Sequence, residues 1–144
     1  MTHVAINPAT EITTLVEDFN RIIKSMVLKL VTLYPTDPRI DRAKKRVMLA
    51  VDIDPISIMH NVGPYLYKYR TQIYAGNDQF FIDNTYDAEF AESVDAEKAD
   101  LSAYIMPKAK CAWRESGSLE RHTYKETVQE LLDLYVEYLA LTIG

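Results

Sequence analysis

The chain has few of the residues from which chemical motifs are usually built. Its one cysteine, Cys111, cannot form a disulfide within the chain, and no cysteine pair is present to hold a structural zinc ion. The four glycines are scattered, which excludes a glycine-rich phosphate loop and favours long helices over a turn-rich sandwich. The three histidines, His3, His60 and His122, form no His-x-x-x-His pair. We therefore expect neither a cofactor nor a metal.

Long apolar runs are also missing. Arg21, Lys24 and Lys29 interrupt the most apolar stretch, which predicts that it does not span a membrane. The N-terminus has no basic region followed by an apolar run, so we expect no signal peptide and an intracellular protein, cytoplasmic or nuclear. The composition, 48% hydrophobic and 26% charged over 144 residues, is that of one globular domain. The net charge of −5 argues against general nucleic-acid binding.

What the chain does contain is apolar residues at steps of three and four, the period of a buried helix face. This period predicts a helix from about Pro8 to Tyr34, where Pro35 ends it, and a last helix from about Leu119 to Leu141. We expect the C-terminal half of the first helix to be buried all round, because it carries further apolar residues off the main stripe. The residues expected in the core are Phe19, Ile23 and Leu132.

Prolines and glycines mark the expected ends of the helices. Asn7, Asp37 and Asp54 each precede a proline, a pattern that is typical of helix starts. Gly63-Pro64 predicts a break or kink after about two turns, and Gly76 is placed to end the next helix. No segment alternates with a period of two. We predict an all-α, single-domain bundle of about five to six helices over residues 1–144, with one helix broken at Gly-Pro and with 83–100 as an acidic, mobile connection.

Two groups of residues could suggest catalysis. His60 follows Asp52 and Asp54, which is a conceivable acid/base arrangement, and Cys111 could act as a nucleophile with His122. Neither group has a recognised catalytic spacing, and a lone apolar cysteine usually belongs to a core. We interpret both groups as structural and expect a non-enzymatic protein.

The segment 39–46 is basic along one side of a helix. Its candidate contacts with a polyanion or an acidic partner are Arg39, Arg42, Lys45 and Arg46. The alternatives are a solvated helix face, or pairing with the acidic stretch 83–100 of the same or a neighbouring molecule.

Aromatic residues crowd the middle of the chain, where five of the ten tyrosines lie between positions 65 and 86. One helix face, carrying Leu66, Tyr69 and Ile73, is expected to point into the core. A different face carries the candidate partner-binding residues, which are Tyr67, Arg70 and Tyr74. Tyrosine and arginine together are typical of protein interfaces. The alternative is that another part of the chain covers these tyrosines.

A longer pattern runs through the same region: Asp54-Pro55, then Gly63-Pro64-Tyr65-Leu66-Tyr67-Lys68-Tyr69-Arg70, with Ile73 and Phe80-Phe81. This pattern resembles small uncharacterised helical proteins of large eukaryotic DNA viruses. The resemblance implies a virus-encoded helical protein that forms part of the particle or acts on a host partner, and it assigns no site residues.

Together these features predict a non-enzymatic protein-binding or assembly component whose partner is another protein or a second copy of the chain. The alternative is a nucleic-acid-associated accessory protein that uses the basic helix 39–46.

Overall fold

The structure is a computed structural model that describes residues 8–76 and 117–143. Within these two ranges the chain is helical and contains no strand, which confirms the all-α prediction. The helices, in chain order, are α1 (Pro8–Leu33), α2 (Pro38–Ile53), α3 (Ile56–Lys68), α4 (Arg70–Ala75) and α8 (Ser118–Ile143). Residues 77–116 lie outside the described residues, and with them the predictions for the acidic stretch 83–100 and for Cys111.

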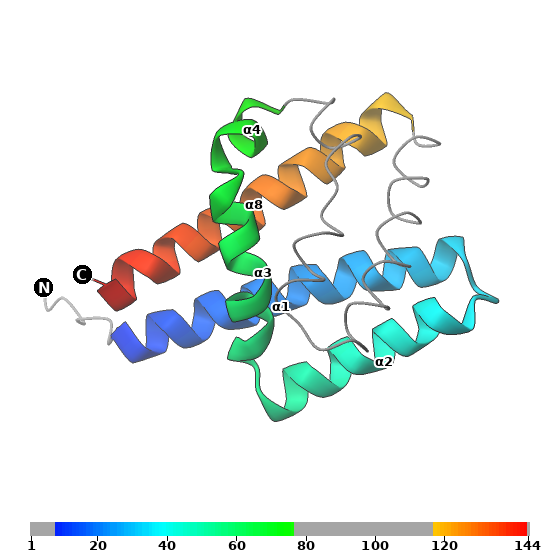
Figure 1. Cartoon of the computed structure of the whole chain (residues 1–144), viewed down its shortest axis with the longest axis horizontal. Coiled ribbons are helices and arrows are strands. Elements are labelled where there is room, and N and C mark those ends of the chain that lie inside the picture. Colours follow the sequence, from blue (N-terminus) through cyan, green and yellow to red (C-terminus); the bar gives the residue numbers. More distant parts are fainter. Residues whose placement is uncertain (1–7, 77–116, 144) are drawn as a thin grey trace, which may run out of the picture.

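The helices form two layers that cross. Figure 1 shows α1 beside α2 along one edge of the molecule, with α8 passing α1 at an angle and α3 running across both. Helix α4 continues from the far end of α3 and lies next to α8. Helices α2 and α4 are therefore at opposite ends of α3 (Figure 1).

The turn between α1 and α2 follows the expected capping chemistry. Pro35 follows the end of α1, and Asp37 Oδ1 accepts a 3.0 Å hydrogen bond from the Arg39 amide, which would otherwise lack a partner at the helix start. Pro38 takes the first helical position, where a missing N–H costs nothing. The prediction of a helix start at Asp37 is confirmed, whereas Asn7 lies outside the described residues.

The start of α3 differs in detail from the expectation. Asp54 ends α2, and its amide donates to the Ala50 carbonyl at 2.8 Å. The carbonyl of Asp54, rather than its carboxylate, accepts from the Ser57 amide at 3.0 Å and from the Ser57 hydroxyl at 2.7 Å. The predicted carboxylate cap is thus wrong, because the main chain already supplies the acceptor.

Of the break or kink predicted at Gly63-Pro64, the break does not occur there. Helix α3 continues through both residues and ends at Lys68, with the interruption at Tyr69 (φ −103°, ψ 22°). Gly63 is buried, and a Cβ atom added to it would overlap the ring of Tyr135 on α8. Glycine here permits a close approach of two helices instead of ending one.

The core consists of two apolar clusters that share α8. The larger cluster joins α1, α3 and α8 and contains Phe19 and Met59, both fully buried. The smaller cluster joins α4 to α8 through Ile73, Val128 and Leu132. The burial predicted for Phe19 and Leu132 is therefore confirmed.

Two expectations about α1 are corrected. Ile23 is only partly buried, and its neighbour Ile22 takes the buried position. The C-terminal half is not buried all round, since Leu28 and Leu33 are 45% and 51% exposed. Burial on every side requires neighbouring elements on every side, and among residues 8–76 and 117–143 the other helices leave part of the C-terminal half of α1 exposed.

One buried polar group ties α1 to the junction of α2 and α3. Asn20 is 3% exposed, and its Nδ2 donates to the Pro55 carbonyl at 2.8 Å. Its Oδ1 is buried without a hydrogen-bond partner. The single bond fixes the start of α3 against the middle of α1, at the cost of one unsatisfied acceptor.

Candidate partner-binding surface

The change of direction at Tyr69 decides which side chains of α3 and α4 point inward. Ile73 is 1% exposed, and Leu66 and Tyr69 pack beside it in the smaller core cluster. This confirms the face that the spacing assigned to the core. Tyr67 and Tyr74 are 40% and 48% exposed, so neighbouring helices leave much of both rings open.

Tyr67 and Arg70 form one preorganised unit. Arg70 Nη1 donates to the Tyr67 carbonyl at 2.8 Å, and the guanidinium carbon lies 4.2 Å from the centroid of the Tyr67 ring. The carbonyl bond holds the arginine over the ring, and the cation–π contact is of about 0.5–1 kcal/mol at an exposed site. The predicted neighbourhood of these two residues is confirmed. The pair offers an aromatic face and a fixed cation at the surface.

Tyr74 has a structural contact as well as an exposed ring. Its hydroxyl donates to Asp133 Oδ1 on α8 at 2.7 Å. Burial, and next the hydrogen bond and negative charge of Asp133, raise the pKa of the Tyr74 hydroxyl to about 12. Tyr74 therefore anchors α4 to α8 while the residue remains exposed. Asp133 is a residue of this surface that the sequence spacing did not reveal.

Side chains of α8 also complete the C-terminal end of α4. Gln129 Nε2 donates to the Ile73 carbonyl at 3.0 Å, and Lys125 Nζ donates to the Gly76 carbonyl at 3.3 Å. Gly76 adopts the left-handed conformation (φ 65°) that ends many helices, as its position in the sequence predicted. These bonds hold the six-residue α4 in place, and with it the orientation of Arg70 and Tyr74.

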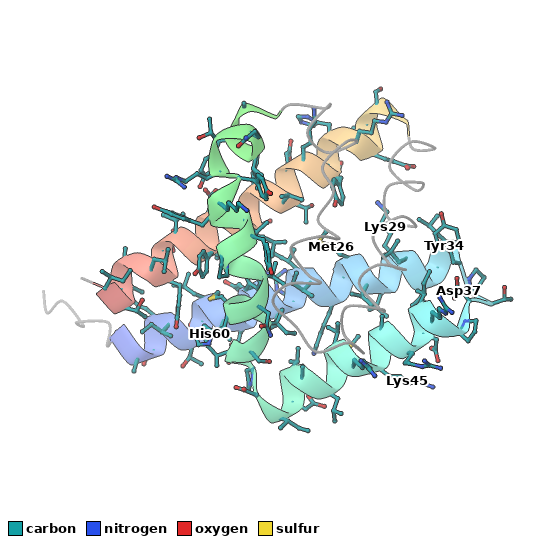
Figure 2. All side chains as sticks on the ribbon, viewed as in Figure 1. Met26, Lys29, Tyr34, Asp37, Lys45 and His60 are labelled. Atoms are coloured by element: carbon teal, nitrogen blue, oxygen red, sulfur yellow. The ribbon has the colours of Figure 1, made fainter. Side chains whose placement is uncertain are left out.

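The candidate catalytic histidine lies in a different setting. His60 Nε2 is 2.9 Å from the Tyr138 hydroxyl of α8, and their ring centroids are 5.9 Å apart. Figure 2 places His60 on α3 near its junction with α2. No hydrogen bond or ion pair joins His60 to Asp52 or Asp54, so the structure does not assemble that group. The other pair cannot be described, because Cys111 lies outside the described ranges.

The basic residues of α2 are divided between two environments. Arg39, Arg42 and Lys45 are exposed, whereas Arg46 is half-buried. Lys45 Nζ lies 3.0 Å from Asp41 Oδ2, and the hydrogen bond from Lys45 is the main cause that lowers the pKa of the Asp41 carboxyl. Figure 2 shows Lys45 along the edge of the molecule that α2 forms. The stretch of positive charge is thus at the surface, at the opposite end of α3 from Tyr67 and Arg70 (Figure 1).

Searches among the residues 8–76 and 117–143 revealed no group of histidine, cysteine or acidic side chains that could hold a metal ion. Across the same ranges, no helix combines the length and the apolarity needed to cross a membrane. The fold and surface define an all-α protein with an exposed aromatic and basic site. Comparison of the chain with protein-family models, with curated proteins and with solved structures found no match.

Proposed function

We propose that this protein is a non-enzymatic component that works by binding another protein through the surface formed by Tyr67, Arg70 and Tyr74. The observation that carries the proposal is the Tyr67–Arg70 pair, an arginine held over an open tyrosine ring by its own bond to the main chain. A side chain that is already ordered loses little conformational entropy when a partner binds. Exposed tyrosine and arginine are also the residues that dominate binding energy at interfaces.

The chemistry of this surface favours a partner that supplies a carboxylate beside apolar area. The guanidinium presents further N–H donors that can bind a carboxylate, and the tyrosine rings present apolar faces. The resemblance of this region to helical proteins of large DNA viruses supports a role in a virus particle or on a host protein.

The proposal is tested by isolating what co-purifies with the protein from its native source and measuring its affinity for two variants. Tyr67→Ala and Arg70→Ala should each lose roughly 1 kcal/mol or more of binding free energy, with little change in melting temperature. Arg21→Ala, which removes an exposed arginine on α1, is the matched control and should bind normally. A sharply lower melting temperature for Tyr67→Ala would show that the residue stabilises the fold. Unchanged affinity of both variants would show that this surface does not bind the partner.

The second candidate is a nucleic-acid-associated accessory protein that uses α2. It is favoured by the exposure of Arg39, Arg42 and Lys45 at intervals of three residues. Retention on DNA or RNA that weakens steeply with salt and is lost on changing Arg39 and Arg42 to Glu would support it. Absence of retention at low salt would contradict it.

A further inference from the structure

The outward side of α2 carries three kinds of residue along the helix. Basic residues come first, and apolar and acidic residues alternate after them toward the C-terminal end. We name this the outer stripe of α2; its members on the helix are Arg42, Lys45, Leu49, Asp52 and Ile53, and Asp54, the residue after the last helical position, adds a further acid. All six are exposed, and the two apolar ones strongly so, with Leu49 at 57% and Ile53 at 73%. These two large aliphatic side chains are one helical turn apart and form a small apolar area on a helix face that is otherwise charged.

The opposite side of the same helix is already occupied. Ile40 is 1% exposed, and Val47, Ala50 and Val51 pack against the larger core cluster with α1 and α3. Because these residues pack inward while the members of the outer stripe are exposed, the stripe is on the side of α2 away from the core, and α2 itself lies along the edge of the molecule (Figure 1). The stripe is therefore positioned to contact a second molecule without any change in the fold.

The order of charges makes the outer stripe complementary to itself. Consider two copies of α2 that pack antiparallel about a two-fold axis at Leu49. A residue a given number of positions before Leu49 in one copy then faces the residue the same number of positions after Leu49 in the other copy. Lys45 then lies opposite Ile53 and next to Asp52, and Arg42 reaches the region of Asp54. Each pair occurs twice, as the self-complementary patch of a two-fold dimer requires.

We infer that the outer stripe of α2 is the contact between two copies of this chain. A second copy satisfies all three parts of the stripe, because each basic half meets an acidic end while Leu49 and Ile53 become covered. An anionic membrane or a nucleic acid would place its negative charge beside Asp52 and Asp54 as well as beside the cations, and would leave one part of the stripe mismatched. This inference is independent of the proposed function, since Tyr67 lies in the last turn of α3 and Arg70 begins α4, at the end of α3 opposite to α2 (Figure 1).

The dimer should be weak. One 16-residue helix from each copy buries less than a standard interface, so the dissociation constant should lie in the micromolar range or above, on the order of 10–100 µM. Because the charged pairs are exposed, added salt should weaken the dimer, while the apolar contact at Leu49 keeps part of the affinity.

Two variants with reversed charge test both the contact and its direction. The first carries Arg42→Glu and Lys45→Glu, and the second carries Asp52→Lys and Asp54→Lys. In an antiparallel pair each variant alone places like charges opposite one another, whereas one copy of each restores opposite charges at both ends. Sedimentation equilibrium of the full chain from about 10 µM to about 1 mM should give a dimer for the wild type and at least tenfold weaker association for each variant alone. The equimolar mixture should regain dimer.

Leu49→Gln is the third variant, because it keeps a good helix former and removes the apolar contact at the axis. It should weaken association in both low and high salt, with an unchanged circular dichroism melt. A wild type that stays monomeric throughout the concentration range would overturn the inference. So would weakening by the first charge variant but not by the second, since the acidic contact would then lie elsewhere, as in the stretch 83–100. If the Tyr67 and Arg70 variants showed no loss of partner binding, the results expected for the α2 dimer would not change.

Discussion

Gly63 illustrates how a residue can have a role different from the one that its local sequence indicates. A glycine followed by a proline predicts the end of a helix, yet α3 continues through both Gly63 and Pro64. The main chain at Gly63 packs against the Tyr135 ring, and no side chain at position 63 fits in that space. Glycine costs about 1 kcal/mol relative to alanine within a helix, so close packing here must offset that loss.

Replacing Gly63 by Ala therefore sets two effects against each other. Alanine gains about 1 kcal/mol of helix propensity, but its methyl group overlaps the Tyr135 ring and forces a shift that typically costs 1–3 kcal/mol or more. Because the overlap is with several ring atoms, we expect a net loss of roughly 1–2 kcal/mol in urea unfolding. Gly117→Ala is the control, since nothing lies within 4 Å of the added atom, and it should be close to neutral. A stabilised Gly63→Ala protein would show that α3 and α8 are less closely packed.

At the scale of elements, α4 shows how a segment too short to be helical alone is held by another helix. Isolated helices of fewer than about 12 residues are marginal in water, and α4 has six. Tyr74 bonds to Asp133, and Gln129 and Lys125 of α8 bind carbonyls at the end of α4. The orientation of the proposed binding surface therefore depends on α8, which lies more than forty residues away in the chain.

The Tyr74–Asp133 bond predicts a loss of stability at alkaline pH. The folded protein holds the pKa of Tyr74 at about 12, above the ordinary value of 10.0, so folding favours the neutral hydroxyl. This contribution is fully present below pH 10 and is lost as the pH rises from 10 through about 12, where the unfolded chain ionises first. Urea unfolding at several pH values should show this fall.

Tyr74→Phe separates the contribution of this hydroxyl from those of other groups. The variant should be about 0.5–1.5 kcal/mol less stable at neutral pH through the lost hydrogen bond, and its stability should fall less steeply above pH 10. Asp133→Asn keeps an acceptor but removes the charge, and should resemble the wild type at neutral pH. Identical pH profiles for Tyr74→Phe and the wild type would contradict the assigned bond.

At the scale of the whole molecule, α8 joins the two core clusters. Leu131 and Tyr135 contribute to the cluster with α1 and α3, whereas Val128 and Leu132 contribute to the cluster with α4. Damage to either cluster should therefore reduce the stability of the whole described fold, because both depend on the placement of one helix.

Phe19→Ala and Leu132→Ala test this dependence, one in each cluster. Both side chains are fully buried, so the losses should be about 3–5 kcal/mol for phenylalanine and about 2–5 kcal/mol for leucine, from lost burial plus the cavity left behind. Thermal melts followed by circular dichroism should begin with a strongly helical spectrum and shift to lower temperature for both variants. Leu119→Ala, at a position 77% exposed, should melt as the wild type does. Unshifted melts for both core variants would mean that these faces do not form the core.

The sequence by itself determined the parts of the fold that depend on neighbours within about one helical turn. The three-four period placed α1 and α8 nearly at their observed ends, Asp37 capped α2 through its carboxylate, and Gly76 ended α4. The same period separated the buried Ile73 from the exposed Tyr67. Such features follow from backbone hydrogen bonds, local sterics and the side-chain directions of one helix, all of which a single stretch of sequence contains.

Tertiary structure alone decided what each helix face meets. It placed the ring of Tyr135 against Gly63, gave Tyr74 a carboxylate partner on α8, and left Leu28 and Leu49 exposed although both are large and apolar. A helical period shows that a face is apolar, but whether that face becomes buried depends on elements far away in the chain. The Tyr67–Arg70 contact could be anticipated because it spans one turn, whereas the bonds that orient α4 could not, because their partners come from α8.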